Sequence, residues 1–163
     1  MNRPITFDNL DERVSFRFAD VNDIPELMAV YLCFYDEAVY KDFLEFDPAR
    51  ARETILHGVV SDTRPHILAV VDQTIVGFIA YILDHTFSVR PCQVLMEFYV
   101  TPEFRKSAIG RSLLAMAMLE GKAAGAGAFH APVASGMESA KSMANMFFKA
   151  GFHQLGFIMR RGY

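Results

Sequence analysis

A short stretch in the middle of the chain combines positive charge, small side chains and the start of a run of helix-forming residues. The first N–H groups of a helix have no partner within the helix, and the helix dipole adds roughly half a positive charge at that end. Small residues leave this backbone accessible, and basic residues add to its charge. The stretch therefore predicts a phosphate-binding loop. It consists of Arg105, Lys106, Ser107, Ala108, Ile109, Gly110, Arg111 and Ser112.

Two familiar phosphate-binding motifs do not match this loop. No Gly-Lys-Ser or Gly-Lys-Thr follows, as a Walker A loop requires, and one glycine stands where a dinucleotide-binding fingerprint needs three. Taken by itself, the loop also fits a second interpretation, in which basic residues precede an ordinary helix and Gly110 serves packing alone.

Patterns along the rest of the chain predict the elements that position the loop. Alternating or continuous apolar runs are typical of strands, and apolar residues at helical spacing indicate helices. The expected strands cover residues 14–20, 66–72, 74–84, 94–100, 129–133 and 152–161, and the expected helices begin near Asn22, Asp47, Ala108 and Ser135. Asp72 and Gln73 should form a hairpin turn. The order β-α-α-β-β-β-α-β-α-β is that of a mixed α/β domain.

Length and composition fit one globular domain. The chain has 163 residues, 52% of them hydrophobic, which is enough for a sizeable core. We expect a single domain over residues 1–163, with residues 1–13 as a flexible arm. The net charge of −3 gives no general attraction to nucleic acid, so we expect no nucleic-acid partner.

The spacing of cysteines, histidines and apolar residues indicates the cellular compartment and whether the protein binds a metal or a membrane. Cys33 and Cys92 are far apart and form no CxxC pair, and the histidines show no metal-ligand spacing, so we expect a cytoplasmic protein without a metal. The polar N-terminal segment does not read as a signal peptide. The longest apolar run, residues 76–83, is well short of the roughly 20 residues of a membrane helix, so we expect no membrane association.

The surroundings of the loop resemble motif A of the GNAT superfamily of acyl-CoA-dependent N-acyltransferases. That motif is written R/Q-x-x-G/A-x-G/A, and Arg105-Lys-Ser-Ala108-Ile-Gly110 fits it, after a strand that ends at Val100. The segment RFADVNDIPEL resembles the family's opening strand and first helix, and FFKAGF at residues 147–152 resembles its late motif L-Y-x-K-x-G-F. The resemblance covers nearly the whole chain, from about residue 14 to residue 160.

This resemblance implies a GNAT fold, an α/β architecture with a mixed, mostly antiparallel central sheet flanked by helices. It also implies that acetyl-CoA is the co-substrate. Backbone N–H groups from Lys106 to Arg111 would then hold the CoA pyrophosphate, and the side chains of Arg105 and Ser112 would assist.

The same resemblance implies a place for the pantetheine arm. It would pair with the strand end formed by Phe98, Tyr99 and Val100. In this family that strand parts from the next one, expected at residues 129–133. Pro132 suits such a strand because proline cannot donate a hydrogen bond to a neighbouring strand.

Acyl transfer to an amine needs a base for the ammonium proton and a donor that polarises the thioester carbonyl. The family suggests a backbone N–H near Tyr99 or Val100 as the donor. Glu97 is our candidate base and Tyr99 a second catalytic candidate, because alternation places both on one face of the strand. Phe98 and Val100 share the opposite, more aliphatic face, which we expect in the core, so Glu97 and Tyr99 should face the cleft. A solvated or salt-bridged structural role for Glu97 remains the alternative.

The general acid of the family is missing from the sequence. Its tyrosine corresponds to Phe147, and Ala140 stands where many relatives carry an asparagine. Tyr99, Ser135 and Ser139 are the candidates to replace it, and a thiol with a pKa of about 8.5 leaves tolerably without an acid. Because the family's acid is missing, a second function also fits the sequence: a GNAT-fold module that binds acyl-CoA with weak or no turnover.

The segment Tyr35–Asp47 is rich in acidic and aromatic residues and falls where the family's acceptor wall is expected. An acidic rim would attract a cationic amine, whereas a solvated helix face is the plainer interpretation. A small-molecule or peptide amine is the expected partner, and its identity stays open. The apolar last strand suggests a possible homodimer.

Overall fold

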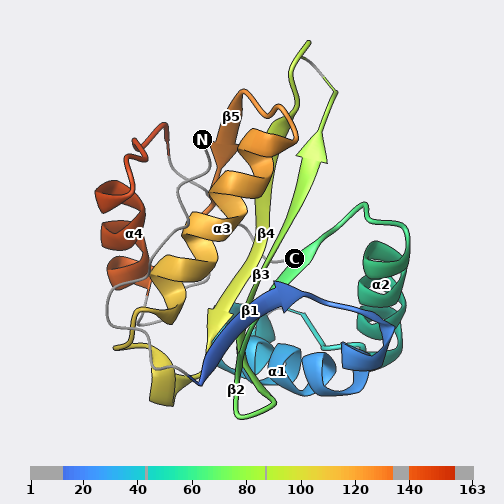
Figure 1. The fold of residues 1–163 in the computed structure, drawn as a ribbon. Helices are drawn as coiled ribbons and strands as arrows, with labels where there is room; N and C mark the ends of the chain where they lie inside the picture. The colour runs from blue at the N-terminus through green and yellow to red at the C-terminus, as the bar shows by residue number, and fades with distance from the viewer. Residues whose placement is uncertain (1–12, 43, 87, 134–139, 157–163) are drawn as a thin grey trace.

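The computed structural model describes residues 13–42, 44–86, 88–133 and 140–156, which form a sheet between two helical layers (Figure 1). The sheet has five strands in the order β1-β2-β3-β4-β5. Neighbouring strands from β1 to β4 are antiparallel, and β5 is parallel to β4. The strands are β1 (Val14–Phe18), β2 (His66–Val71), β3 (Thr74–Asp84), β4 (Cys92–Val100) and β5 (Ala128–His130).

The helices cover both faces of the sheet. Helices α1 (Ile24–Glu37) and α2 (Pro48–Val60) lie on one face, and α3 (Ile109–Ala123) and α4 (Ala140–Lys149) lie on the other (Figure 1). Three short 3-10 helices complete the described elements: η1 (Val21–Asp23), η2 (Val39–Asp42) and η3 (Pro102–Phe104).

The predicted mixed α/β order is confirmed as far as α4. The expected last strand is not observed over residues 152–156, which adopt no regular structure, and its remainder, like residues 1–12 of the expected arm, lies outside the described residues. The predicted turn is confirmed, since Asp72 and Gln73 have φ angles of 48° and 67°. Two consecutive positive φ angles are typical of the type I′ turn of a two-residue hairpin.

Both faces of the sheet are buried, which explains why the sequence of β2 contains a continuous apolar run. Successive side chains of a strand point to opposite faces. Leu68 and Val70 therefore pack in the core with α1 and α2, while Ile67, Ala69 and Val71 pack in the core with α3. All residues of β2 are buried. The two cores hold the helical layers at fixed positions on the sheet.

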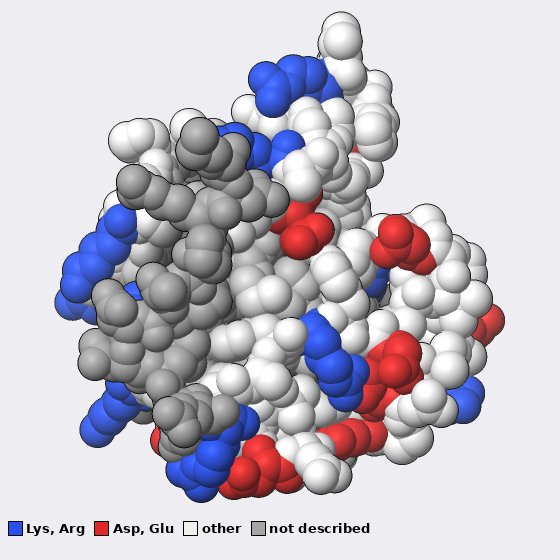
Figure 2. Space-filling view, viewed as in Figure 1, with Lys and Arg blue, Asp and Glu red and all other residues white. Residues whose placement is uncertain are grey.

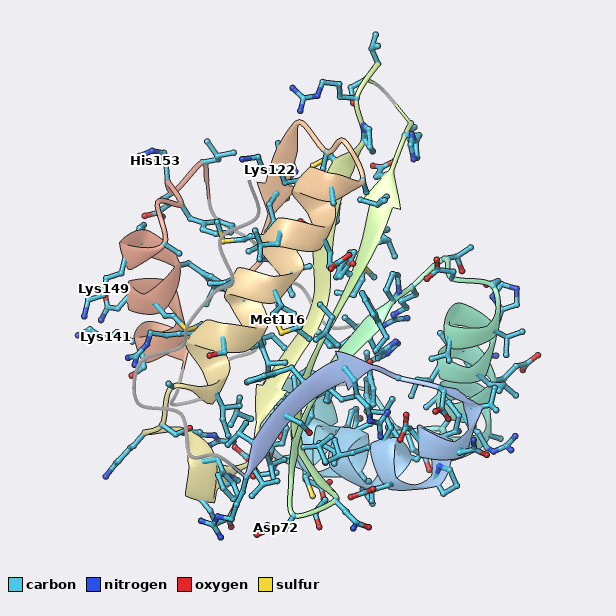
Figure 3. The ribbon with its side chains drawn as sticks, in the orientation of Figure 1. Asp72, Met116, Lys122, Lys141, Lys149 and His153 are labelled. Carbon is cyan, nitrogen blue, oxygen red and sulfur yellow. The ribbon has the colours of Figure 1, made fainter. Side chains whose placement is uncertain are left out.

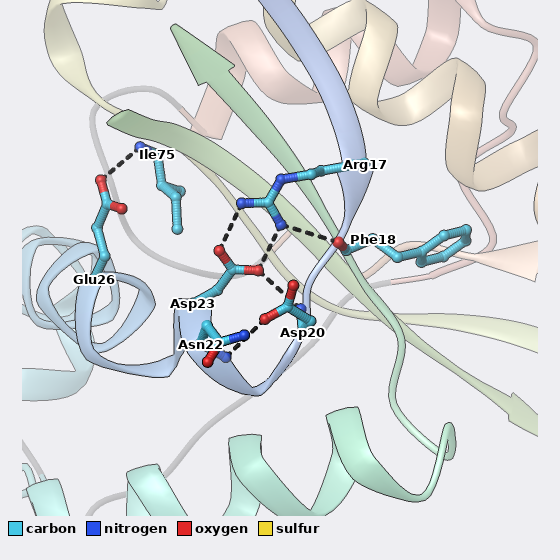
Figure 4. Close-up of polar contacts among 7 residues, drawn as sticks. All are labelled: Arg17, Phe18, Asp20, Asn22, Asp23, Glu26 and Ile75. Atoms are coloured by element: carbon cyan, nitrogen blue, oxygen red, sulfur yellow. Dashed lines mark hydrogen bonds and ion pairs between the residues drawn. The ribbon is translucent and has the colours of Figure 1, made fainter. Parts of the chain in front are cut away.

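A polar network fixes the start of α1 (Figure 4). The Arg17 guanidinium donates to both oxygens of Asp23, at 2.5 and 2.6 Å, and Asp23 is only 8% exposed. The expectation that Asn22 caps the helix is wrong, because the N–H of Asn22 instead donates to the Asp20 carboxylate at 2.7 Å and Asp20 caps η1. One turn later, Glu26 accepts from the N–H of Ile75 at 2.7 Å and ties α1 to β3.

We predict that Arg17→Ala lowers the free energy of unfolding by about 1–2 kcal/mol at pH 7, because the substitution leaves a buried carboxylate without its two-pronged partner. The hydrogen bond from Arg17 holds the pKa of Asp23 below its usual range. This stabilisation is therefore present above the unfolded-state pKa of about 3.9 and is lost as the pH falls through the lower folded-state pKa.

Urea denaturation at pH 7 and at successively lower pH measures the effect. The loss caused by Arg17→Ala should shrink as Asp23 becomes protonated. Arg17→Lys keeps the charge but not the paired geometry, and should be intermediate. If the loss of unfolding free energy in Arg17→Ala did not change with pH, the stabilising role given to the Arg17–Asp23 ion pair would be contradicted.

Candidate active site

Strand β4 is longer than its neighbour β5 and leaves part of its edge open. The parallel pairing covers only Cys92, Gln93 and Val94, which lie opposite residues 128–130. The strand then continues to Val100 without a partner on that side among the residues that the structure describes. β5 ends before Pro132, as the predicted parting of these strands requires.

The register with β3 shows which backbone groups point to the open edge. Val100 lies opposite Gly77, and the N–H of Thr101 donates to the carbonyl of Val76 at 2.9 Å. In an antiparallel pair, hydrogen-bonded positions alternate with positions whose N–H and C=O groups point away from the partner. The Tyr99 backbone therefore bonds to β3, while the N–H and C=O groups of Phe98 and Val100 point to the open edge.

The N-terminus of α3 lies just beyond this edge. The chain passes through η3 and the basic loop, and α3 begins at Ile109, one residue later than expected. The N–H of Ile109 donates to Ser107 Oγ at 3.2 Å. Within the described part of the chain, no acceptor is found for the N–H groups of Gly110 and Arg111. These two groups are the free donors that a helix N-terminus offers to an anion.

Two adjoining cavities of about 400 and 130 Å³ lie at this corner. Arg105, Gly110, Ser142 and Met146 line both. The larger cavity lies between α3 and α4 and is also lined by Ser107, Arg111, Leu114, Ala115, Met118, Asn145, Lys149 and Ala150. The smaller one reaches the open strand edge and is also lined by Phe98, Tyr99, Val100 and Met143. Lys149 and Lys141 both extend from α4, and only Lys149 borders a cavity (Figure 3).

Some residues of the predicted loop contribute no side chain to the cavities. Ala108 and Ile109 pack in the core below α3, and Lys106 is exposed beside it. The expectation that the Ser112 side chain assists phosphate binding stays a prediction. Ser112 is 1% exposed and lines neither cavity, because it lies on the face of α3 that packs against the sheet.

A close contact between α3 and β4 sets the position of the helix. Gln93 is 1% exposed, and its side-chain amide donates to the carbonyl of Ala117 at 2.7 Å. A Cβ atom at Gly121 would lie 2.0 Å from the Gln93 Oε1 atom, so only glycine allows this approach. Gln93 is also one of the three β4 residues paired with β5.

A β-bulge in β4 decides the direction of Glu97. Ala80 pairs with Glu97, whereas Tyr81 pairs with Leu95, so Met96 is an extra residue on β4. The bulge turns Glu97 to the α1 side although Leu95, two residues earlier, packs in the core with α3. Glu97 and Tyr99 thus share a face, as expected.

That face is covered rather than open to a cleft. Tyr99 is 3% exposed and packs edge-on against Phe34 of α1. Glu97 accepts a short ion-pair hydrogen bond from Arg64, and both side chains are 17% exposed. The other Glu97 oxygen lies 3.2 Å from the Tyr31 hydroxyl. The contacts of Glu97 are those of the salt-bridged alternative.

Tyr31 and His66 extend this cluster into the core. The Tyr31 hydroxyl lies 2.9 Å from His66 Nε2, and His66 Nδ1 lies 2.8 Å from the Arg64 carbonyl. A carbonyl only accepts, so Nδ1 carries the proton and Nε2 is an acceptor, and the single Tyr31 hydroxyl proton is shared between His66 Nε2 and the Glu97 carboxylate. Burial, then the Arg64 charge, lowers the pKa of His66 to about 4, and burial, then Glu97, raises the pKa of Tyr31 well above its usual value. The cluster therefore carries one fixed ion pair and two neutral rings at pH 7.

A second cluster joins α1 to the loop. The Tyr99 hydroxyl donates to Glu37 Oε1 at 2.5 Å, and Arg105 Nη2 donates to Glu37 Oε2 at 2.6 Å. Arg105 Nε also donates to the Val100 carbonyl at 2.9 Å. Burial, then the Glu37 hydrogen bond, raises the pKa of Tyr99, which keeps the hydroxyl protonated. Glu37 lies in the acidic segment Tyr35–Asp47, where nothing in its local sequence distinguishes it from the other acidic residues.

Charge differs between the two sides of the molecule. On the face viewed in Figure 2, Asp and Glu lie mainly over α1 and α2, while the edge over α4 carries Lys. In the part of the chain that the structure describes, no group of three or more His, Cys, Asp or Glu could hold a metal ion. None of the described helices combines the length and the apolarity needed to cross a membrane.

Comparison with known families agrees with this geometry. Residues 62–154, more than half of the chain, match the acetyltransferase (GNAT) domain family. The chain belongs to the GNAT acetyltransferase family. No curated protein sequence matches it significantly.

Solved structures with the same fold share little sequence with this GNAT protein. A possible acetyltransferase from Clostridium difficile 630 superposes with a TM-score of 0.74 at 14% identity, over 93% of this chain and 98% of that one. A predicted acetyltransferase with acetyl-CoA from Clostridium acetobutylicum gives 0.72 at 15%, over 91% and 96%. An aminoglycoside acetyltransferase from an uncultured soil metagenomic sample, in complex with sisomicin, gives 0.66 at 14%, over 93% and 95%. At these identities the likeness concerns the fold.

The position of the GNAT tyrosine is occupied by an apolar, buried side chain. Phe147 is 3% exposed, and its ring centroid lies 6.3 Å from that of Phe98 and 5.1 Å from that of Phe152. It closes the core beside the open strand edge and has no proton to give. Ser135 and Ser139, two of the candidate replacements, lie outside the described residues.

We predict that Glu97→Gln lowers the free energy of unfolding by about 2–3 kcal/mol, because it leaves the largely buried Arg64 guanidinium without its counter-charge. Arg64→Met combined with Glu97→Gln removes both charges and should recover most of the loss. Thermal and urea denaturation of the two variants measure this. A change below about 0.5 kcal/mol for Glu97→Gln would show that Glu97 is an ordinary surface acid.

Proposed function

We propose that this GNAT protein is an N-acetyltransferase that moves an acetyl group from acetyl-CoA to a primary amine by direct attack in a ternary complex. One observation carries the proposal: the open edge of β4 and the free N-terminus of α3 border the same pair of cavities, with Arg105 and Gly110 in both. An extended amide-containing arm needs a strand edge, and a diphosphate needs a helix N-terminus.

The chain's groups divide the recognition of acetyl-CoA between them. The N–H groups of Gly110 and Arg111, with the charges of Arg111 and Lys149 in the larger cavity, would hold the diphosphate. Lys106, exposed at the loop, adds to the attraction of an anion. The N–H and C=O groups of Phe98 and Val100 would pair with the pantetheine arm.

The same strand edge supplies the polarising donor. The Tyr99 N–H is committed to β3, so the donor to the thioester carbonyl is the N–H of Phe98 or Val100. The leaving thiolate needs no tyrosine at residue 147, since a thiol pKa of about 8.5 allows protonation by water.

The catalytic candidates Glu97 and Tyr99 enter the proposal in different ways. Glu97 serves as base only if the acceptor displaces Arg64 or Tyr31, since these groups contact its two oxygens. Tyr99 stays protonated and fixes one oxygen of Glu37. Glu37 is thus a second carboxylate near the open edge, and its side chain is 31% exposed.

The acceptor is proposed to be a small-molecule or peptide amine that carries positive charge. The acidic α1–α2 side of the molecule supports this choice, because it attracts ammonium groups. One protein of the same fold is an aminoglycoside acetyltransferase in complex with sisomicin. Which amine this chain accepts is left to a screen.

A second function is kept because two observations favour it. Phe147 is apolar where the family has its acid, and Glu97 is held in an ion pair. Both features suit an acyl-CoA-binding module with weak or no turnover. Calorimetric titration with acetyl-CoA, followed by a thiol-release assay over a panel of amines, separates the two: the enzyme binds and releases CoA, and the module only binds.

We predict that Gly110→Glu weakens acetyl-CoA binding at least about tenfold, which corresponds to about 1.4 kcal/mol. A Cβ atom at residue 110 would meet its nearest described atom, Phe98 Cζ, at 3.5 Å, an ordinary contact, so the fold should tolerate a side chain there. The added carboxylate would instead bring bulk and negative charge to the two cavities that Gly110 lines, against the proposed diphosphate position.

Calorimetry with acetyl-CoA and a melting curve measure the two effects. Gly156→Glu is the matched control, since a Cβ there has no atom of the described residues within 4 Å and the residue lines neither cavity. Unchanged affinity in Gly110→Glu would place acetyl-CoA elsewhere. No binding by the wild-type protein would refute the proposed function.

A further inference from the structure

Arg105 lies between the acceptor side and the cofactor side of the site. Its guanidinium contacts Glu37 at the end of α1, and its side chain also lines both cavities beside α3. One long, flexible side chain thus borders two regions that each attract a cation. One is a carboxylate, and the other is the proposed position of the phosphates.

The groups around the Arg105 guanidinium form a cation site. The Glu37 carboxylate accepts from Nη2 at 2.6 Å, and the Val100 carbonyl accepts from Nε at 2.9 Å. The Tyr99 ring lies below, with its centroid 5.3 Å from the guanidinium carbon. A carboxylate, a carbonyl and an aromatic face are each attractive to a cation. The chain's own arginine fills the site.

The position of Glu37 in its helix is electrostatically unfavourable without such a cation. It is the last residue of α1, where the helix dipole is negative, and the last turn of α1 carries no basic residue. Arg105 supplies the missing positive charge from the opposite wall. This ion pair is 31% exposed on both sides, and exposed pairs are weak enough to exchange partners.

The Val100 carbonyl links the ion pair to the strand edge. It is one of the groups that point to the open edge, where the pantetheine arm is proposed to pair. Arg105 therefore occupies a backbone acceptor on the proposed cofactor path and a carboxylate on the acceptor side at once. Moving the side chain toward the α3 N-terminus would free both.

We propose that Arg105 is a positioning residue shared between Glu37 and the phosphates of acetyl-CoA, so that cofactor binding draws Arg105 away and uncovers the Glu37 carboxylate. This inference rests on the proposed function. It makes the Glu37–Arg105 pair a competitor of the cofactor. Competition of this kind is a coupling between two sites through one side chain.

The competition predicts the direction in which a substitution at Glu37 changes the affinity for acetyl-CoA. Glu37→Gln removes the charge that holds Arg105, so acetyl-CoA should bind roughly two- to fivefold tighter, as expected for release of an exposed ion pair. A purely structural role for Glu37 would leave affinity unchanged or weaken it. Asp36→Asn is the matched control, because it removes the same charge one residue earlier on α1 and is exposed.

A double-mutant cycle read by calorimetry with acetyl-CoA completes the test. In an Arg105→Ala background, Glu37→Gln should no longer tighten binding, since no side chain remains to be released. The inference is overturned if Asp36→Asn tightens binding equally, if Glu37→Gln does not tighten it, or if the tightening persists without Arg105. If the wild-type protein binds no acetyl-CoA, the proposed function fails and this inference fails with it. Melting curves confirm that each variant is folded.

Discussion

The parting of β4 from β5 is the constraint on which the rest of the site depends. Three paired residues hold the two strands together, and beyond Val94 the β4 edge has no strand partner among the described residues. Unpaired backbone groups at a sheet edge bind extended chains readily, so they need a suitable occupant. Because β3 already satisfies Tyr99, the groups offered at this edge belong to Phe98 and Val100.

The same strand positions the other half of the site. Gln93, next to the last β4 residue paired with β5, reaches through the space left by Gly121 and holds the middle of α3. The N-terminus of α3 consequently lies at the end of β4, where two cavities meet. One strand thus carries the open edge proposed for an extended arm, a bulge that turns Glu97 and an anchor for the helix proposed to bind phosphate. A small displacement of α3 would separate features that act together.

The sequence predicted what local patterns determine. The loop before α3, the hairpin at Asp72 and the element order as far as α4 depend on neighbouring residues, and the structure contains these elements where they were expected. Contacts between distant segments were not predictable. Nothing near Glu97 indicates that Arg64 neutralises it, and alternation alone does not show that both faces of β4 are covered. The buried position of Ser112 likewise depends on how α3 rotates against the sheet.

Amide hydrogen exchange, followed by NMR with and without acetyl-CoA, tests the central claim most directly. If acetyl-CoA binds along the open edge and at the helix start, the N–H groups of Phe98, Val100, Gly110 and Arg111 become protected. Tyr99, already bonded to β3, changes little and is an internal control. Unchanged exchange at those four amides while acetyl-CoA is bound, or protection confined to another part of the chain, would contradict the account.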